Sequence, residues 1–145
     1  MQRALTDAAL GQETDPEGRT LGQIAWHMII MTGMTGSAVG LAIEAPPRGT
    51  PKPNAAMLIA DAYEKAKESL RQQAATSLMD QKLAEEIEIF GRKMSRAAAL
   101  HGLIRHQIHH RGQMTVLMRG AGLTVPGVYG PSREESAAMR AKQGS

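Results

Sequence analysis

Three of the five histidines lie within little more than one helical turn, in the stretch His-Gln-Ile-His-His-Arg-Gly-Gln (residues 106–113). His106 and His110 are four residues apart, so on an α-helix their side chains lie one above the other on the same face. Two imidazoles in this arrangement can converge on one ion with almost no change in the backbone. Histidine is also a common ligand of transition metals at neutral pH. The stretch therefore predicts a long helix that carries part of a metal site.

A third histidine, His27, lies far upstream in an apolar run that covers residues 24–31. The pair on residues 106 and 110 is, by itself, also consistent with two hydrogen-bonded or surface histidines. A buried imidazole must be hydrogen-bonded or bound to a metal, however, so the apolar surroundings of His27 favour a metal site. We therefore expect the ligands to be His27, His106 and His110. His109 is directed about 100° away from His110 on a helix, and we expect that it is not a ligand.

The expected ligand set consists of three neutral imidazoles and no carboxylate. Such a set suits Zn(II) or Ni(II), and it leaves at least one coordination position for water or a substrate. A closed structural zinc site would normally supply four ligands, so we interpret the site as a present or former catalytic centre. The His-Glu-x-x-His pattern of metalloproteases is absent from the sequence. The polar residues nearest to the ligands in the sequence are Gln113, Arg111 and His109, and Gly112 suggests a close helix crossing.

The composition favours a single all-α domain over residues 1–145. The chain is 42% hydrophobic but only 3% aromatic, and it contains ten methionines. A core of Leu, Ile, Ala and Met, with few β-branched or aromatic residues, favours helices over sheets. We expect residues 132–145 to form a short terminal helix or a disordered tail.

The pattern of apolar residues predicts three long helices, over residues 21–42, 54–76 and 96–119. Thr20 with Gln23, then Asn54, and then Ser95 are the expected N-terminal caps. On the last helix, the expected core side comprises Leu100, Leu103, Ile104, Ile108, Val116 and Leu117. A short helix is expected near residues 2–10 and a proline-rich loop at 45–53. Residues 77–94 are expected to be extended or irregular, with an edge strand at 86–90.

Charge, cysteine content and hydropathy argue against a nucleic-acid-binding protein, a disulfide-containing protein and a membrane protein. The net charge is +3, and basic residues alternate with acidic ones, which is typical of solvated helix faces and not of a nucleic-acid-binding protein. There is no cysteine, hence no disulfide, no thiolate ligand and no cysteine nucleophile. The longest apolar stretch, near residues 24–34, is too short to span a bilayer, and no signal peptide is recognisable. We expect no membrane association and a cytoplasmic protein.

Three segments resemble the DinB family, whose members are helical-bundle metal proteins related to thiol-dependent S-transferases. These segments cover residues 18–27, with Trp26 before His27, residues 106–114 and residues 121–131. The resemblance implies a four-helix bundle with up-down-down-up topology, usually dimeric, whose ligands correspond to His27, His106 and His110. Only a handful of residues precede Leu5 here, so we expect the first helix to be short or missing, or to be replaced by a partner chain.

Three functions are compatible with these features. The first is a metal-dependent transferase or hydrolase, in which the ion lowers the pKa of bound water or of a low-molecular-weight thiol that attacks a small electrophilic substrate. The second is a non-catalytic, stress-related metal-binding protein, and the third is a structural dimer in which the ion only ties two helices together. We also expect a homodimer, because three long helices leave an apolar face uncovered. The helices at 21–42 and 54–76 are the candidate contacts.

Overall fold

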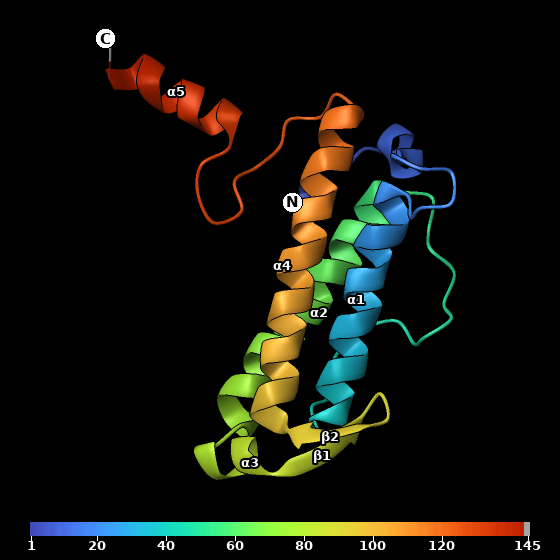
Figure 1. The fold of residues 1–145 in the computed structure, drawn as a ribbon, viewed down its shortest axis with the longest axis vertical. Coiled ribbons are helices and arrows are strands. Elements are labelled where there is room, and N and C mark those ends of the chain that lie inside the picture. The colour runs from blue at the N-terminus through green and yellow to red at the C-terminus, as the bar shows by residue number, and fades with distance from the viewer. Residues whose placement is uncertain (144–145) are drawn as a thin grey trace.

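The computed structural model describes residues 1–143 and is built around three long helices (Figure 1). These are α1 (Leu21–Ala38), α2 (Ala56–Ser77) and α4 (Arg96–Gly120). Helix α1 packs against both of the others, whereas α2 and α4 are farther apart and are linked by hydrogen bonds of Tyr63 with Gln107 and Arg111. The N-terminal segment forms only two short 3-10 helices, η1 (Gln2–Ala4) and η2 (Asp7–Gly11). The expectation of a helical bundle whose first helix is short or missing is therefore confirmed.

Helix α1 begins at the predicted cap and ends before the predicted boundary. The Thr20 side chain accepts a hydrogen bond from the Gln23 N–H, and the Gln23 side chain accepts one from the Thr20 N–H. The helix ends at Ala38 and not at residue 42, because Gly40 has a φ of 84°, a left-handed conformation that reverses the chain. Two turns earlier, a Cβ atom on Gly33 would lie 2.6 Å from the Cβ of Ala45. The returning segment therefore lies directly on α1.

Helix α2 is capped by a residue that is distant in the sequence, and the prediction that Asn54 is its cap was wrong. The helix begins at Ala56, and the Oδ1 atom of Asp7 accepts the Ala56 N–H at 2.6 Å. The side chain of Asn54 instead accepts a hydrogen bond from Lys52. An acidic side chain at this position also interacts favourably with the helix dipole. The cap ties the N-terminal segment to α2.

A β-hairpin closes the end of the bundle at which α4 begins. Residues 77–94, expected to be extended or irregular, contain α3 (Asp80–Ala84) and the antiparallel strands β1 (Glu86–Ile89) and β2 (Arg92–Ser95). The expected edge strand is thus present, but it ends one residue earlier. Phe90 and Gly91 form the turn, with φ values of 53° and 70°. The buried side chain of Ile89 packs with Val39, Leu41 and Ala99.

Helix α4 begins after Ser95, whose side chain accepts the Ala98 N–H as predicted. Leu103 and Leu117 are buried, as expected for the core side. Ile104 and Val116, which were assigned to the same side, are 54% and 59% exposed, so that assignment was wrong for them. Ile104 lines an open cavity beside α2, whereas Val116 lines a separate open cavity together with Ile24. Ile108 is also exposed, at 38%.

Helix α4 contains two interior glycines at which an added Cβ atom would meet no neighbouring atom. Glycine costs about 1 kcal/mol relative to alanine at such positions, a cost that close packing can offset. A Cβ atom on Gly112 would meet no atom within 4 Å, so the helix crossing expected there is not found. A Cβ atom on Gly102 would likewise point into open space.

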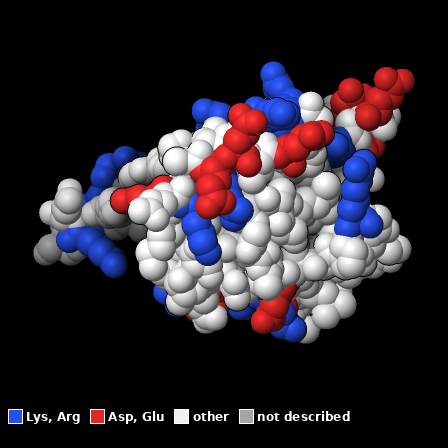
Figure 2. Space-filling model, turned by 90° about the horizontal axis from the view of Figure 1, so that it is seen from below, with Lys and Arg blue, Asp and Glu red and all other residues white. Residues whose placement is uncertain are grey.

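The C-terminal segment forms α5 (Arg133–Gln143), where the sequence suggested a short terminal helix or a disordered tail. It stands apart from the bundle in Figure 1 and is connected to α4 by the ion pair between Glu134 and Arg119. Residues 144–145, the rest of the expected tail, lie outside the described residues. Within residues 1–143, no helix has the length and apolar character needed to cross a membrane. Seen from the hairpin end, acidic and basic side chains are interspersed (Figure 2).

Candidate metal centre

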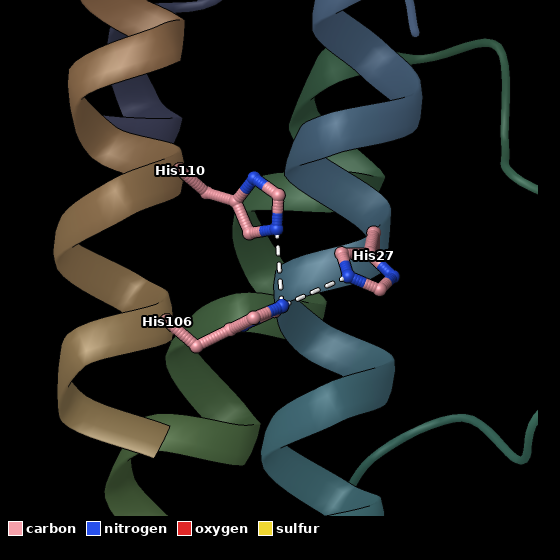
Figure 3. Close-up of side chains that lie close together, drawn as sticks. All are labelled: His27, His106 and His110. Atoms are coloured by element: carbon pink, nitrogen blue, oxygen red, sulfur yellow. Dashed lines mark hydrogen bonds between the residues drawn. The ribbon is translucent and has the colours of Figure 1, made fainter. Parts of the chain in front are cut away.

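Three histidines from two helices meet in the middle of the bundle (Figure 3). His106 and His110 project from successive turns of α4, and the packing of α1 along α4 brings His27 opposite them. The Nε2 atom of His106 lies 3.1 Å from the Nε2 of His27 and 3.1 Å from the Nε2 of His110. All three possible ligand atoms lie within 4.8 Å of one another. The structure thus brings together the three residues that the sequence indicated.

The protonation of His110 is fixed by a neighbour on the same helix. Its Nδ1 atom lies 2.6 Å from the Oε1 atom of Gln113, which can only accept a hydrogen bond. The neutral ring therefore carries its proton on Nδ1, and its Nε2 atom presents a lone pair to the other two rings. A hydrogen bond of this kind is the usual way in which a protein orients a histidine that binds a metal.

Hydrogen bonding alone cannot satisfy both contacts of His106. If its Nε2 carries a proton, that proton can be donated to His110, but the nitrogen then has no lone pair to accept from His27. If its Nε2 carries no proton, it can accept from His27, but it then faces the lone pair of His110. An ion between the three nitrogens satisfies all of the lone pairs at once. Imidazoles bound to tetrahedral zinc have nitrogens about 3.3–3.4 Å apart, close to the 3.1 Å from His106 to each of the other two rings.

Burial keeps these imidazoles in the form that binds metals. It lowers the pKa of His27 to about 4, and the positive charge of Arg19 acts in the same direction. Burial also lowers the pKa of His106 and of His110, although the hydrogen bond to Gln113 partly opposes the effect on His110. The rings are therefore neutral at pH 7, and no carboxylate belongs to the cluster in the described part of the chain. The residues fit a divalent ion held by three neutral nitrogens.

The other polar residues singled out in the sequence are distributed differently. Gln113 lies beside the cluster, as expected. Arg111 does not, because its Nη2 atom donates a hydrogen bond to the hydroxyl of Tyr63 on α2 at 3.0 Å. His109 is exposed, with its ring centroid 5.0 Å from that of His110, and it is outside the group of three. That it binds no metal remains a prediction.

Arg19 is the residue that sequence reasoning missed. Its charge lowers the pKa of all three histidines, so it lies near the open side of the cluster. Arg19 and Gln113 line a polar cavity of about 460 Å³ that reaches His110 and also contains Asp15 and His109. The available signal was its position eight residues before His27, about two helical turns away. Because Arg19 precedes the helix, its direction could not be derived from helical periodicity.

A family model and a crystal structure relate this chain to the DinB family, and a further protein is similar to it in sequence. The model of the DinB family matches residues 1–144. The protein YrdA of Bacillus subtilis (strain 168) is 47% identical over 132 residues, which are 91% of this chain and 79% of YrdA. A DinB-like protein from Bacillus cereus ATCC 10987 has a crystal structure with a TM-score of 0.83 and 44% identity, covering 89% of this chain and 86% of that one. The DinB-like protein YjoA of Bacillus subtilis has a TM-score of 0.66 at 21% identity, covering 91% and 87% respectively, and supports the fold alone.

We expect the purified protein to bind one divalent ion per chain through the three clustered histidines. Replacing His27, His106 or His110 by alanine should remove the ion, because two imidazoles hold zinc far more weakly than three. His109→Ala is the matched control and should retain the ion. Metal analysis by mass spectrometry after dialysis measures both results. Unchanged metal content in the triple variant, with the fold intact by circular dichroism, would refute the assignment.

We further expect the metal-free protein to lose stability as the pH falls from about 7 to about 5. In the unfolded chain the histidines take up protons near their ordinary pKa of about 6.5, whereas the folded protein keeps them neutral to lower pH. The unfolded state therefore binds more protons in this range, and the free energy of unfolding decreases. Urea denaturation at several pH values measures it. The His27→Gln variant should show a shallower dependence, and a slope equal to that of the unsubstituted protein would contradict this explanation.

Proposed function

Since the chain belongs to the DinB family, we propose that it is a divalent-metal-binding protein that acts as a transferase with an external low-molecular-weight thiol. Zinc or nickel is the proposed ion. The observation that carries the proposal is the convergence of three neutral Nε2 atoms beside a polar cavity. A divalent ion held in this way would lower the pKa of a bound thiol and supply a thiolate at neutral pH.

The residues of the chain have separate roles in this proposal. His27, His106 and His110 hold the ion, and Gln113 keeps His110 in the tautomer that binds it. Arg19 lines the polar cavity and makes no ion pair within residues 1–143, so its charge is available to an anionic group of the thiol. The chain contains no cysteine, which fits a thiol supplied from outside. A small electrophilic molecule would accept the thiol.

Two other functions use the same site. In a metal-dependent hydrolase, the nucleophile would be a water molecule, and Asp15 is the only carboxylate that lines the polar cavity. In a non-catalytic, stress-related metal-binding protein, the three histidines would only retain the ion, which agrees with the absence of a carboxylate from the cluster within the described residues. A measurement of thiol binding distinguishes the transferase from the hydrolase and from the non-catalytic protein, because only the transferase needs a thiol.

We also propose that the protein is a cytoplasmic homodimer. The exposed apolar residues of α4 support a dimer, because Ile104 and Ile108, one turn apart, are exposed on its outer side next to α2. Met57 and Leu58 are likewise exposed near the start of α2. Helix α1, one of the two candidates from the sequence, is largely covered by α2 and α4, so α2 together with the outer side of α4 is the better candidate.

We expect glutathione and cysteine to bind the zinc-loaded protein and to bind the metal-free protein much more weakly. Calorimetry in two buffers of different ionisation enthalpy should also detect the proton released when a thiolate forms. The Arg19→Ala variant should bind anionic glutathione about fivefold more weakly, a typical effect of one partly exposed charge. Arg111→Ala is the control and should bind normally. Thiol binding to neither form, or equally to both, would exclude thiol activation.

For the dimer, we expect sedimentation equilibrium at micromolar concentration to give twice the chain mass of 15.6 kDa. The Ile104→Glu variant should shift the equilibrium to monomers, because it places a charge in the proposed contact. Glu88→Gln, on the exposed face of the hairpin, should have no effect. Purely monomeric unsubstituted protein would refute the proposal.

A further inference from the structure

A second cavity reaches the histidine cluster from the hairpin end of the bundle. It lies between the β1–β2 hairpin, α1 and the first half of α4, has a volume of about 270 Å³, and extends to His106. It shares no lining residue with the polar cavity, which reaches His110 from the second half of α4. The two cavities therefore meet the cluster at different levels along α4. We call the second one the hairpin cavity.

The lining of the hairpin cavity combines apolar side chains with unpaired positive charge. Its walls include Met31, Met94 and Leu103, and its charged residues are Arg92 and Arg105. No aspartate or glutamate lines it. In the described part of the chain, neither arginine forms an ion pair. An apolar wall next to uncompensated guanidinium groups suits a molecule with an apolar body and an anionic group.

Gly102 keeps the hairpin cavity open, although glycine destabilises the helix in which it lies. This glycine lies in the interior of α4 and lines the hairpin cavity. A Cβ atom there would meet nothing within 4 Å, and its φ is not left-handed, so neither crowding nor backbone conformation requires glycine. Alanine would favour the helix. A larger residue at this position would occupy the cavity, which supplies the missing reason for the glycine.

Phe90 provides an independent observation at the same cavity. It lines the cavity and occupies the first position of the hairpin turn with a φ of 53°. Asparagine, aspartate and glycine are favoured at this position, and a bulky residue is strained there. The side chain is 59% exposed, so packing within the chain does not offset the strain. Contact with a bound apolar molecule would do so.

We propose that the hairpin cavity binds a small apolar carboxylate, with its apolar body between Met31 and Met94 and its carboxylate near Arg92 and Arg105. The volume has room for on the order of ten non-hydrogen atoms. The assignment of this molecule as the second substrate of the metal centre rests on the proposed function. Its binding to the cavity does not, because none of the four contact residues is a metal ligand.

The test is a titration of metal-free protein with phenylacetate, followed by NMR of ¹³C-labelled methionine methyl groups. The methyl signals of Met31 and Met94 should shift, whereas those of Met28 and Met114, which line another cavity, should stay unchanged. Shifts at Met28 and Met114 alone, or no shifts at all, would overturn the proposal. Uncharged 2-phenylethanol should bind at least several-fold more weakly, and equal binding would overturn the role of the arginines.

Two matched variants decide whether the cavity itself is the site. Gly102→Leu should fill it and weaken phenylacetate binding by about tenfold or more. Gly112→Leu places the same side chain elsewhere on α4, where there is also open space, and should bind normally. Both variants should be at least as resistant to heat as the unsubstituted protein, so loss of the fold would be recognised. Unchanged binding by Gly102→Leu would refute the proposal.

Repeating the titration with cobalt-loaded protein links the cavity to the metal centre. A paramagnetic ion beside His106 should broaden the signals of bound phenylacetate in unsubstituted protein and not in Gly102→Leu. Failure of cobalt binding would contradict the proposed function alone, since the metal-free titration stands without it. Normal cobalt binding without methionine shifts would contradict the hairpin cavity alone.

Discussion

The site depends on bringing three uncharged imidazoles so close together that hydrogen bonds cannot satisfy both contacts of His106 at once. One of these two contacts can be a hydrogen bond, but the other then lacks a partner, and three protonated rings would repel one another. The packing of α1 along α4 imposes this arrangement, burial keeps the rings neutral, and Gln113 holds the proton of His110 on the far side of its ring. An ion placed among the three nitrogens turns this unfavourable arrangement into a stable one.

The neutral ligand set also determines what kind of molecule the site favours. Three imidazoles leave the full charge of a divalent ion uncompensated, and Arg19 adds a further positive charge nearby. With an ion bound, anions such as thiolates and carboxylates would be the ligands that this charge favours. The polar cavity and the hairpin cavity reach different members of the cluster, and they differ in lining. In the proposed transferase, this arrangement would keep the two reactants apart until both are beside the ion.

The sequence predicted the long helices and the His106–His110 pair because both follow from local periodicity, and it predicted His27 because a polar ring in an apolar run needs a partner. His106 and His110 lie on one face by helical geometry alone, and the caps at Thr20 and Ser95 are local patterns. The predictions that were wrong concern contacts between residues that are far apart in the sequence. Asp7 caps α2 from 49 residues away, which no local pattern reveals. Ile104 and Val116 have a core-like spacing, but each lines an open cavity, which the spacing does not reveal. Arg19 was missed because the segment before α1 has no regular periodicity.

The most direct test of the central claim is X-ray absorption spectroscopy of the zinc-loaded protein. We predict three imidazole nitrogens at about 2.0–2.1 Å, with the characteristic scattering of the outer ring atoms, and one or two further light atoms at the open positions. The spectrum should change at the open positions alone when a thiol is added, with a sulfur atom at about 2.3 Å. A first shell dominated by oxygen, or one with fewer than three imidazoles, would contradict the claim that these histidines form the metal centre.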